Sequence, residues 1–278
     1  FVLFLGKPLY SIVTYFNPTD VARQIANAHS LFNIVNVILL FPAAGLLVKL
    51  SRIIIPDKVE EGTFIHLDPR ILATPAIALK NTLAETRNMA NLAKESLKFA
   101  ILAYREKNEE HMRKSLNMEQ DINTYQRSIM AYLQKLSKTN LSNHDRRVVD
   151  ALFNTVNDIE RIGDHAENIA ELSQSYMADN VEFDPEALSE LREVIDHVLM
   201  TFRTTIEAMT TGDKEKAKQV IVYEEQMDEL EELYRQNHIS RMHKKEASIE
   251  SGVIFLDFVS NLERISDHCM NVADTILA

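Results

Sequence analysis

One helical phrase rich in acidic side chains occurs twice in this chain of 278 residues. The first copy runs from Val156 to Ala170 and the second from Val259 to Ala273, with roughly half of the aligned positions identical. Each copy holds a Glu, an Asp four residues later and an Asn four residues after that. Side chains at this spacing share one face of a helix, so each copy predicts a stripe of oxygen donors. The stripes are Glu160, Asp164 and Asn168 in the first copy and Glu263, Asp267 and Asn271 in the second.

Two chemical interpretations fit such a stripe. Neighbouring carboxylates repel each other unless a cation lies nearby, and Arg161 and Arg264 could act as that cation in ordinary surface salt bridges. Repetition of the whole pattern favours a bound metal ion instead, because carboxylate and amide oxygens are suitable metal ligands. His165 and His268 follow the aspartates directly and point to another side of the helix, so we interpret them as interface residues.

The helix before each phrase carries a matching pair of donors. Glu119 and Asn123 precede the first phrase, and Glu224 and Asp228 occupy the equivalent positions before the second. An amide in place of a carboxylate keeps an oxygen ligand but removes a charge. We therefore expect the first repeat to hold a metal less tightly than the second.

These donors are positioned by helices almost throughout the second part of the chain. The sequence has only six Gly and seven Pro and no Trp, which suits long helices. Breaks are predicted at 107–108, 138–143, 178–185, 211–213 and about 244–245, which divides the region into six helices. Asp184 before Pro185 is a typical helix start. The predicted fold is all-α, with a domain at 71–278 made of two three-helix units, about 71–178 and 184–278.

The first 56 residues differ from the rest and predict membrane segments. Leu31 to Val48 contains no charged residue and is about as long as a membrane-spanning helix needs to be. A buried helix of a soluble protein is the alternative. Lys49, Arg52 and Lys58 follow the apolar stretch and only Arg23 precedes it closely, which places the acidic domain in the cytoplasm by the positive-inside tendency. Residues 57–70 are then a linker.

Three polar residues accompany this apolar stretch, namely His29, Asn33 and Asn36, spaced about one helical turn apart. Polar side chains inside a span often face a transport pathway or a neighbouring helix. We favour helix packing or an interfacial position over a transport site for these three.

Charge and cysteine content narrow the choice of partners. The formal net charge is -11, so the surface repels phosphate backbones and nucleic acid is excluded as the expected partner, whereas cation binding is favoured. The single cysteine, Cys269, allows no intrachain disulfide and is compatible with a reducing compartment.

The doubled ERIGDH and ERISDH phrases, the preceding acidic turns and the order of six helices resemble the PhoU family of phosphate-signalling proteins. The resemblance covers about residues 71–278. It implies two three-helix bundles whose acidic motifs bind iron or zinc clusters, and a regulatory role without enzymatic activity. Partners implied are inorganic phosphate and a phosphate-signalling protein.

The N-terminal part resembles a second family. Residues 26–33, leading into the apolar stretch, are similar to the last membrane segments of bacterial sodium-dependent phosphate cotransporters, some of which end in a PhoU-like domain. This resemblance implies the C-terminal part of a sodium/phosphate symporter in the lipid bilayer of the inner membrane, with sodium as coupling ion. The Gln-Ser-Ser signatures of those transporters are absent from the sequence, so the chain is not a complete transporter.

Other classes of protein stay open. A regulator of the PhoU type without transport activity is the nearest alternative. A ferritin-like di-iron oxidase would need Glu-x-x-His pairs, which the two phrases do not contain. A helical scaffold would bind no metal, and the alanine-rich stretch from Ala73 to Tyr104 is compatible with a homodimer.

Overall fold

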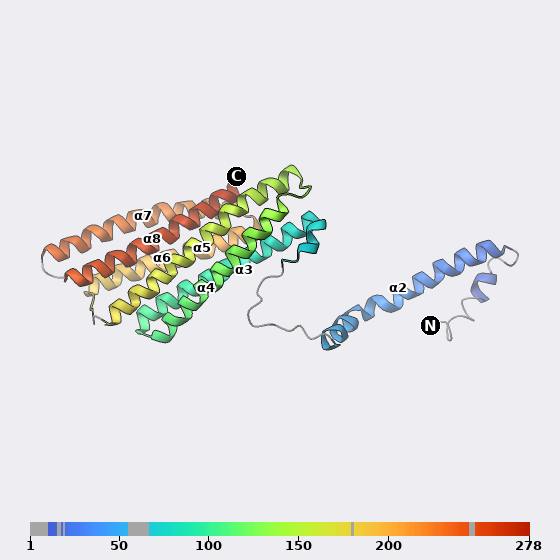
Figure 1. Ribbon diagram of the computed structural model, residues 1–278, viewed down its shortest axis with the longest axis horizontal. Coiled ribbons are helices and arrows are strands. Elements are labelled where there is room, and N and C mark those ends of the chain that lie inside the picture. The colour runs from blue at the N-terminus through green and yellow to red at the C-terminus, as the bar shows by residue number, and fades with distance from the viewer. Residues whose placement is uncertain (1–10, 16–17, 19, 55–66, 179–180, 245–247) are drawn as a thin grey trace. The chain divides into compact units, whose positions relative to one another are not determined.

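All regular structure in the described part of the chain is helical, which confirms the predicted class. The computed structural model describes residues 11–15, 18, 20–54, 67–178, 181–244 and 248–278, without the side chains of residues 36 and 39–54. The chain divides into two compact units, residues 1–63 and 64–278 (Figure 1). The second unit contains both acidic phrases.

The second unit repeats one arrangement of three long helices. In the first repeat these are α3 (Pro75–Glu106), α4 (Glu109–Leu136) and α5 (Asn143–Ala178), preceded by a short 3₁₀ helix, η1 (Pro69–Ala73). In the second they are α6 (Pro185–Thr211), α7 (Lys214–His243) and α8 (Ile249–Leu277). Helices within each repeat pack on one another, and α5 packs on α8, so that the two acidic phrases lie in adjacent helices (Figure 1).

Side-chain caps fix where these helices begin, at the positions that the sequence predicts. The Asp184 carboxylate accepts a hydrogen bond from the backbone N–H of Ala187 at 2.8 Å, with Pro185 in the first turn. Asn108 caps α4 and Asp213 caps α7 in the same way. Such caps satisfy N–H groups that have no partner inside the helix.

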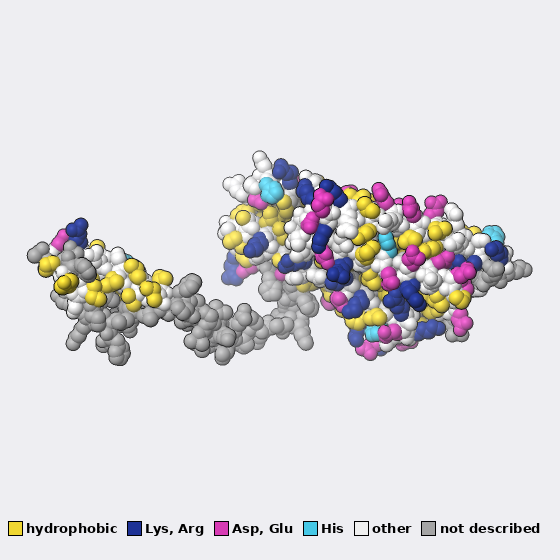
Figure 2. All heavy atoms as spheres, turned by 180° about the vertical axis from the view of Figure 1, so that it is seen from behind, with side chains coloured by type: hydrophobic (Ala, Val, Ile, Leu, Met, Phe, Trp, Pro, Cys, Tyr) yellow, Lys and Arg dark blue, Asp and Glu magenta, His cyan; other side chains and the backbone are white. Residues whose placement is uncertain are grey.

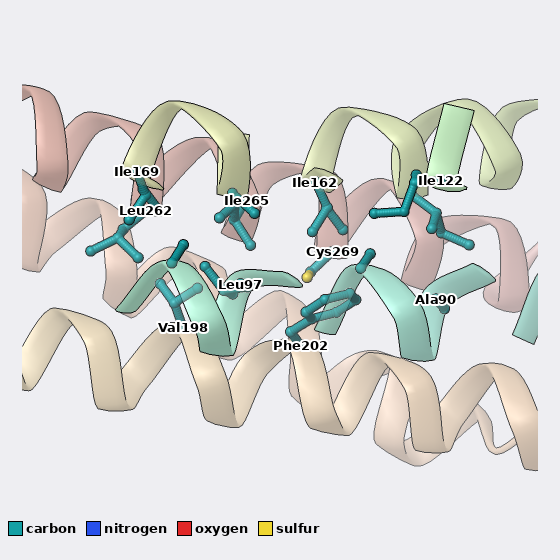
Figure 3. Packing of buried hydrophobic residues seen from close by; sticks show 14 of the residues in the cluster. Ala90, Leu97, Ile122, Ile162, Ile169, Val198, Phe202, Leu262, Ile265 and Cys269 are labelled. Atoms are coloured by element: carbon teal, nitrogen blue, oxygen red, sulfur yellow. The ribbon is translucent and has the colours of Figure 1, made fainter. Parts of the chain in front are cut away.

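A single apolar core joins the two repeats. Leu97 of α3, Ile162 of α5, Phe202 of α6 and Cys269 of α8 point into the same interior space (Figure 3). All four are at most 1% exposed, and burying a side chain of this size stabilises the fold by about 1.5–3 kcal/mol. Apolar and small residues at alternating spacings of three and four form the buried faces of α5 and α8, with Ile276 of α8 only partly buried.

Two helices of the first repeat approach each other closely at Gly163. A Cβ atom at this position would lie 3.0 Å from Cδ1 of Ile122, a residue of α4. Gly163 thus lets α4 approach α5 closely, directly beside the carboxylates of the first repeat. Ser266, the equivalent residue of α8, is fully buried.

The first unit is described mainly through α2 (Val21–Ile54). Several of its large apolar side chains are exposed, including Ile25, Ile34, Val37 and Ile38. Figure 2 shows hydrophobic side chains at the surface of this unit. No helix among the described residues is both long and apolar enough to cross a bilayer. This finding gives no support to the predicted span from Leu31 to Val48, of which residue 36 and residues 39–48 have side chains outside the described set.

Candidate metal centre

Three carboxylates converge in the second repeat, where α7 lies against α8. Glu224 and Asp228 of α7 and Asp267 of α8 each offer an oxygen, and these oxygens lie within 4.8 Å of one another. Glu224 is buried, Asp267 is half-buried and Asp228 is exposed. The group is therefore open to solvent on one side and closed by protein on the other, as an ion entering from water would require.

These three residues, Glu224, Asp228 and Asp267, form what we call the α7/α8 cluster, in which three carboxylates share one neighbouring cation among the described residues, Arg264. Burial, and then the charges of Asp228 and Asp267, raise the pKa of Glu224 to about 7. Burial and the Asp267 charge likewise raise the pKa of Asp228. In both groups burial is the largest cause and neighbouring negative charge adds to it, so a divalent cation among the three carboxylates would offset both costs.

Glu263, one turn before Asp267, extends the same acidic region along α8. Burial and Asp267 raise its pKa to about 7, although Arg264 opposes the change. The Arg264 side chain lies 3.5 Å from Glu263 and 3.2 Å from Asp267. Because this arginine is 58% exposed, its contacts are surface ion pairs of small energy, and they leave the pKa of Glu263 raised.

The first repeat brings together the equivalent residues but in a different state. Asn123 donates a hydrogen bond to the Glu119 carboxylate, so the amide already satisfies part of that group. Burial raises the pKa of Glu119, with further contributions from Glu167, Asp164 and Glu160. Within the described residues, these carboxylates form no group of three as compact as the α7/α8 cluster.

Glu167 is a site residue that the sequence comparison did not select. It faces Glu119 closely enough to raise that residue's pKa, and its own pKa is raised by burial and by Glu171 and Asp164. Its counterpart in the second phrase is Met270, so a search for shared positions passes over it. The sequence does contain an indication of this residue, because Glu167 is acidic and lies three residues after Asp164, on the same face of the helix.

Asn168 and Asn271 lie in the contact between the two phrases, where each side-chain amide binds the opposite helix. The Asn168 amide and Nδ1 of His165 bind Oδ1 of Asn261 on α8, at 3.1 and 2.9 Å. The equivalent residues of the second phrase, Asn271 and His268, bind Oδ1 of Asp158 on α5, at 3.3 and 3.0 Å.

The two histidines meet at the centre of this contact. The rings of His165 and His268 are stacked with centroids 5.7 Å apart. Their bonds to the opposite helix agree with the interpretation of both as interface residues. Each phrase thus contributes both to the contact that holds the repeats together and to an acidic region.

The remaining predicted residues lie in the first unit. His29 and Asn33 are exposed on α2, and the side chain of Asn36 is outside the described residues. No contact in the described part of α2 brings His29 and Asn33 together.

The α7/α8 cluster suits a divalent cation, because its ligands are carboxylate oxygens, these oxygens lie within 4.8 Å of one another, and the side chains are acidic. Glu224, Asp228 and Asp267 would hold it, with Glu263 close at hand, and the first repeat offers Glu119, Glu160 and Asp164 for a second ion. When bound, such an ion would supply positive charge beyond that of the exposed arginines Arg161 and Arg264.

Comparison with known proteins identifies the domain. The PhoU domain family model matches residues 86–173 and 191–276, one match in each repeat. The crystal structure of PhoU from Pseudomonas aeruginosa has the same fold, with a TM-score of 0.68 and 20% sequence identity over 74% of this chain and 97% of that chain.

Curated relatives add two kinds of protein. A putative inorganic phosphate export protein, YjbB of Salmonella typhimurium, is 23% identical over 98% of this chain, which spans about half (49%) of that protein's length. A phosphate-specific transport system accessory protein PhoU homolog of Thermotoga maritima is 27% identical over 70% of this chain and 83% of its own. Through the two matched regions, this chain belongs to the PhoU domain family.

Proposed function

We propose that this chain regulates phosphate movement across a membrane through a helical domain that binds divalent metal ions. The observation that carries the proposal is the α7/α8 cluster, whose three oxygens lie within 4.8 Å. Iron or zinc is the proposed metal, held by Glu224, Asp228 and Asp267 with Glu263, and more weakly by Glu119, Asn123, Glu160 and Asp164. The relatives named for phosphate transport and phosphate export support the phosphate context.

Metal binding would act on the domain by joining neighbouring helices. Without an ion, Glu224 of α7 is held partly buried beside Asp228 and Asp267, and burial first and these neighbouring charges second raise its pKa to about 7. An ion bound between them favours the close arrangement of the two helices, and a partner that recognises this arrangement would be coupled to metal occupancy. The proposal assigns the domain binding and signalling, and no catalysis.

The test combines metal content with a regulatory readout. We expect the full chain, purified without chelator, to contain iron or zinc, and a Glu224→Gln/Asp267→Asn variant to lose most of it. The matched control is Glu229→Gln, which removes an exposed carboxylate from the same helix. Expressed in a bacterium that lacks its own PhoU, the parent and the control should repress a phosphate-starvation reporter. Equal repression by the metal-free variant would separate regulation from metal and contradict the proposed mechanism.

A second part of the proposal places the chain in a longer membrane protein. The exposed apolar side chains of α2, among them Ile25, Val37 and Ile38, need a cover, and lipid or further membrane helices would provide it. The first matched relatives are about twice as long as this chain, and one is named a putative phosphate exporter. The proposed location is the inner membrane with the helical domain in the cytoplasm.

Sodium coupling is the most specific part of this proposal. It is tested by phosphate flux into vesicles that contain the full-length parent protein, with sodium replaced by potassium. A flux that depends on sodium supports a symporter. An outward phosphate flux that is the same in sodium and in potassium contradicts sodium coupling. It does not contradict the proposed regulatory role of the helical domain.

A further inference from the structure

A hollow rich in positive charge lies where the first repeat meets the second. Its volume is about 460 Å³, and it is lined by the C-terminal parts of α3 and α5 and by the first turns of α6. Three cations line it, Arg105, Lys107 and Arg192, against one carboxylate, Asp196. On a chain with a net charge of -11, such a concentration of cations in one concave place requires an explanation.

The carboxylate neutralises only part of this charge. Asp196 binds Arg105 at 3.3 Å, in a pair with both side chains largely exposed. Within the described residues, Arg192 has no ion pair, and the Lys107 ammonium lies 5.1 Å from the ring centre of Tyr176. Two of the three cations therefore face the hollow without a carboxylate partner in the described structure.

Two tyrosines add neutral hydrogen-bond donors to the lining. Tyr104 and Tyr176 are 7% and 6% exposed, and their rings contact each other at 5.1 Å. Neither phenol group has a hydrogen-bond partner among the described residues. Burial raises the pKa of Tyr104 far above its usual value, although Arg105 and Arg192 both oppose the change, so the hydroxyl stays protonated. Burial likewise raises the pKa of Tyr176, with a contribution from Glu182.

Lys107 has a left-handed backbone conformation, which is unfavourable for a residue with a side chain. Lys107 has a φ of 48°, and it is the only residue other than glycine with a positive φ in the described part of the chain. The equivalent position of the second repeat is Gly212, which ends α6 with a φ of 66°. Glycine adopts this conformation without steric cost and lysine does not, and retained strain of this kind is frequent at binding sites.

The second repeat lacks the other elements of the hollow as well. A shift of 105 residues, which aligns Lys107 with Gly212, also aligns Tyr104 with Met209 and Arg105 with Thr210. The same shift pairs Arg192 with Arg87 of α3 and Asp196 with Asn91. The combination of cations and phenols is therefore a property of one repeat junction and not a consequence of the shared fold.

We infer that this hollow binds a condensed or organic phosphate, with Arg105, Lys107 and Arg192 on its charged oxygens and the hydroxyls of Tyr104 and Tyr176 as additional donors. Guanidinium groups suit phosphate because their parallel N–H groups match its oxygens. The volume exceeds what one inorganic phosphate ion fills, which favours pyrophosphate or the phosphate chain of a nucleotide. This site is separate from the α7/α8 cluster in both position and sign of charge.

Calorimetric titration of the full chain with pyrophosphate, ATP and inorganic phosphate tests the inference. We expect pyrophosphate or ATP to bind, more tightly than inorganic phosphate, and to bind more weakly as salt is raised. Lys107→Gly and Arg192→Gln should each weaken binding about tenfold, and the double variant should abolish it. Glycine at position 107 suits the positive φ, so this variant is expected to fold, which circular dichroism verifies.

The matched control is Arg87→Gln, which removes the repeat-equivalent of Arg192 from outside the hollow and should leave the titration unchanged. Glu224→Gln/Asp267→Asn should also leave it unchanged, because binding does not pass through a metal at the α7/α8 cluster. The inference is overturned if no probe binds the parent at millimolar concentration, or if the double variant binds as the parent does. Loss of binding in the cluster variant alone would place the anion on a metal and overturn it as well.

Discussion

The two repeats of this domain share the order of their helices but differ in the acidic regions of their second and third helices. The second repeat has Glu224 and Asp228 on α7, and both join Asp267 in a compact cluster. The first has Glu119 and Asn123 on α4, and the amide binds the glutamate instead of leaving it free. One amide in place of one carboxylate thus turns part of a ligand set into an internal hydrogen bond.

Removing metal from the second repeat should have the largest effect on the stability of the domain. If the ion is present at about a hundred times its dissociation constant, its loss lowers the free energy of unfolding by about 3 kcal/mol. Thermal unfolding of the full chain with and without EDTA, followed by circular dichroism, measures this. The Glu224→Gln/Asp267→Asn variant should be insensitive to EDTA, and an equal response of variant and parent would mean that the chelator acts elsewhere.

Exchanging the distinguishing residue between repeats should reverse their difference. Asn123→Asp restores a second carboxylate on α4, and Asp228→Asn removes one from α7. We expect the first change to tighten metal binding to the first repeat about tenfold and the second to weaken binding to the α7/α8 cluster by a similar factor, about 1.4 kcal/mol each. Metal titration of the two single variants and of the combined exchange measures both effects. Unchanged affinities in both would show that position 123/228 does not determine the difference.

How far the sequence predicted this arrangement depends on what each residue contacts. Helix ends at Lys107, Asp184 and Gly212 were predictable because caps and turns are local. Glu160 and Glu263 were predictable as acidic neighbours because the spacing along one helix fixes their face. The partners across helices were not, since the pairing of Asn168 with Asn261 depends on how α5 packs on α8.

The N-terminal part shows a similar limit. Its apolar composition was read directly from the sequence, whereas the membrane span inferred from that composition receives no support from the described helices. A run of apolar residues indicates that these side chains are shielded from water. It does not distinguish between shielding by lipid and shielding by other helices. The hollow beside Lys107 was missed for another reason, because its residues are distributed over three helices and share no spacing.

The pH dependence of stability is a third test of how the two repeats differ. It concerns the metal-free domain, in which Glu224 and Glu263 of the second repeat can take up protons. The pKa values of Glu224 and Glu263 rise from 4.5 to about 7 in the folded state. A raised folded pKa gives stability that is fully present below pH 4.5 and is lost as pH rises through about 7. The metal-free chain should therefore be less stable at pH 8 than at pH 5.5.

Glu224→Gln and Glu263→Gln should each recover about 1 kcal/mol of that loss at pH 8, because solvent screening reduces the effect of partly exposed charges. Urea unfolding at the two pH values, in the presence of EDTA, gives the measurement. Glu229→Gln, on an exposed side of α7, serves as the control and should change neither value. If stability instead rose between pH 5.5 and 8 in the parent, the carboxylates would not be the groups that limit it.

The smallest expected effect is a difference between the two sides of the contact that joins the repeats, where one side has a carboxylate acceptor and the other an amide acceptor. Oδ1 of Asp158 accepts from His268 and Asn271, and Oδ1 of Asn261 accepts from His165 and Asn168. A charged acceptor forms the stronger hydrogen bonds, so Asp158→Ala should cost about 1.5 kcal/mol and Asn261→Ala about 1 kcal/mol. Urea unfolding at pH 7 of the two single variants and the double variant measures both losses. A larger loss for Asn261→Ala would show that charge at position 158 adds nothing, and that shape alone holds α5 against α8.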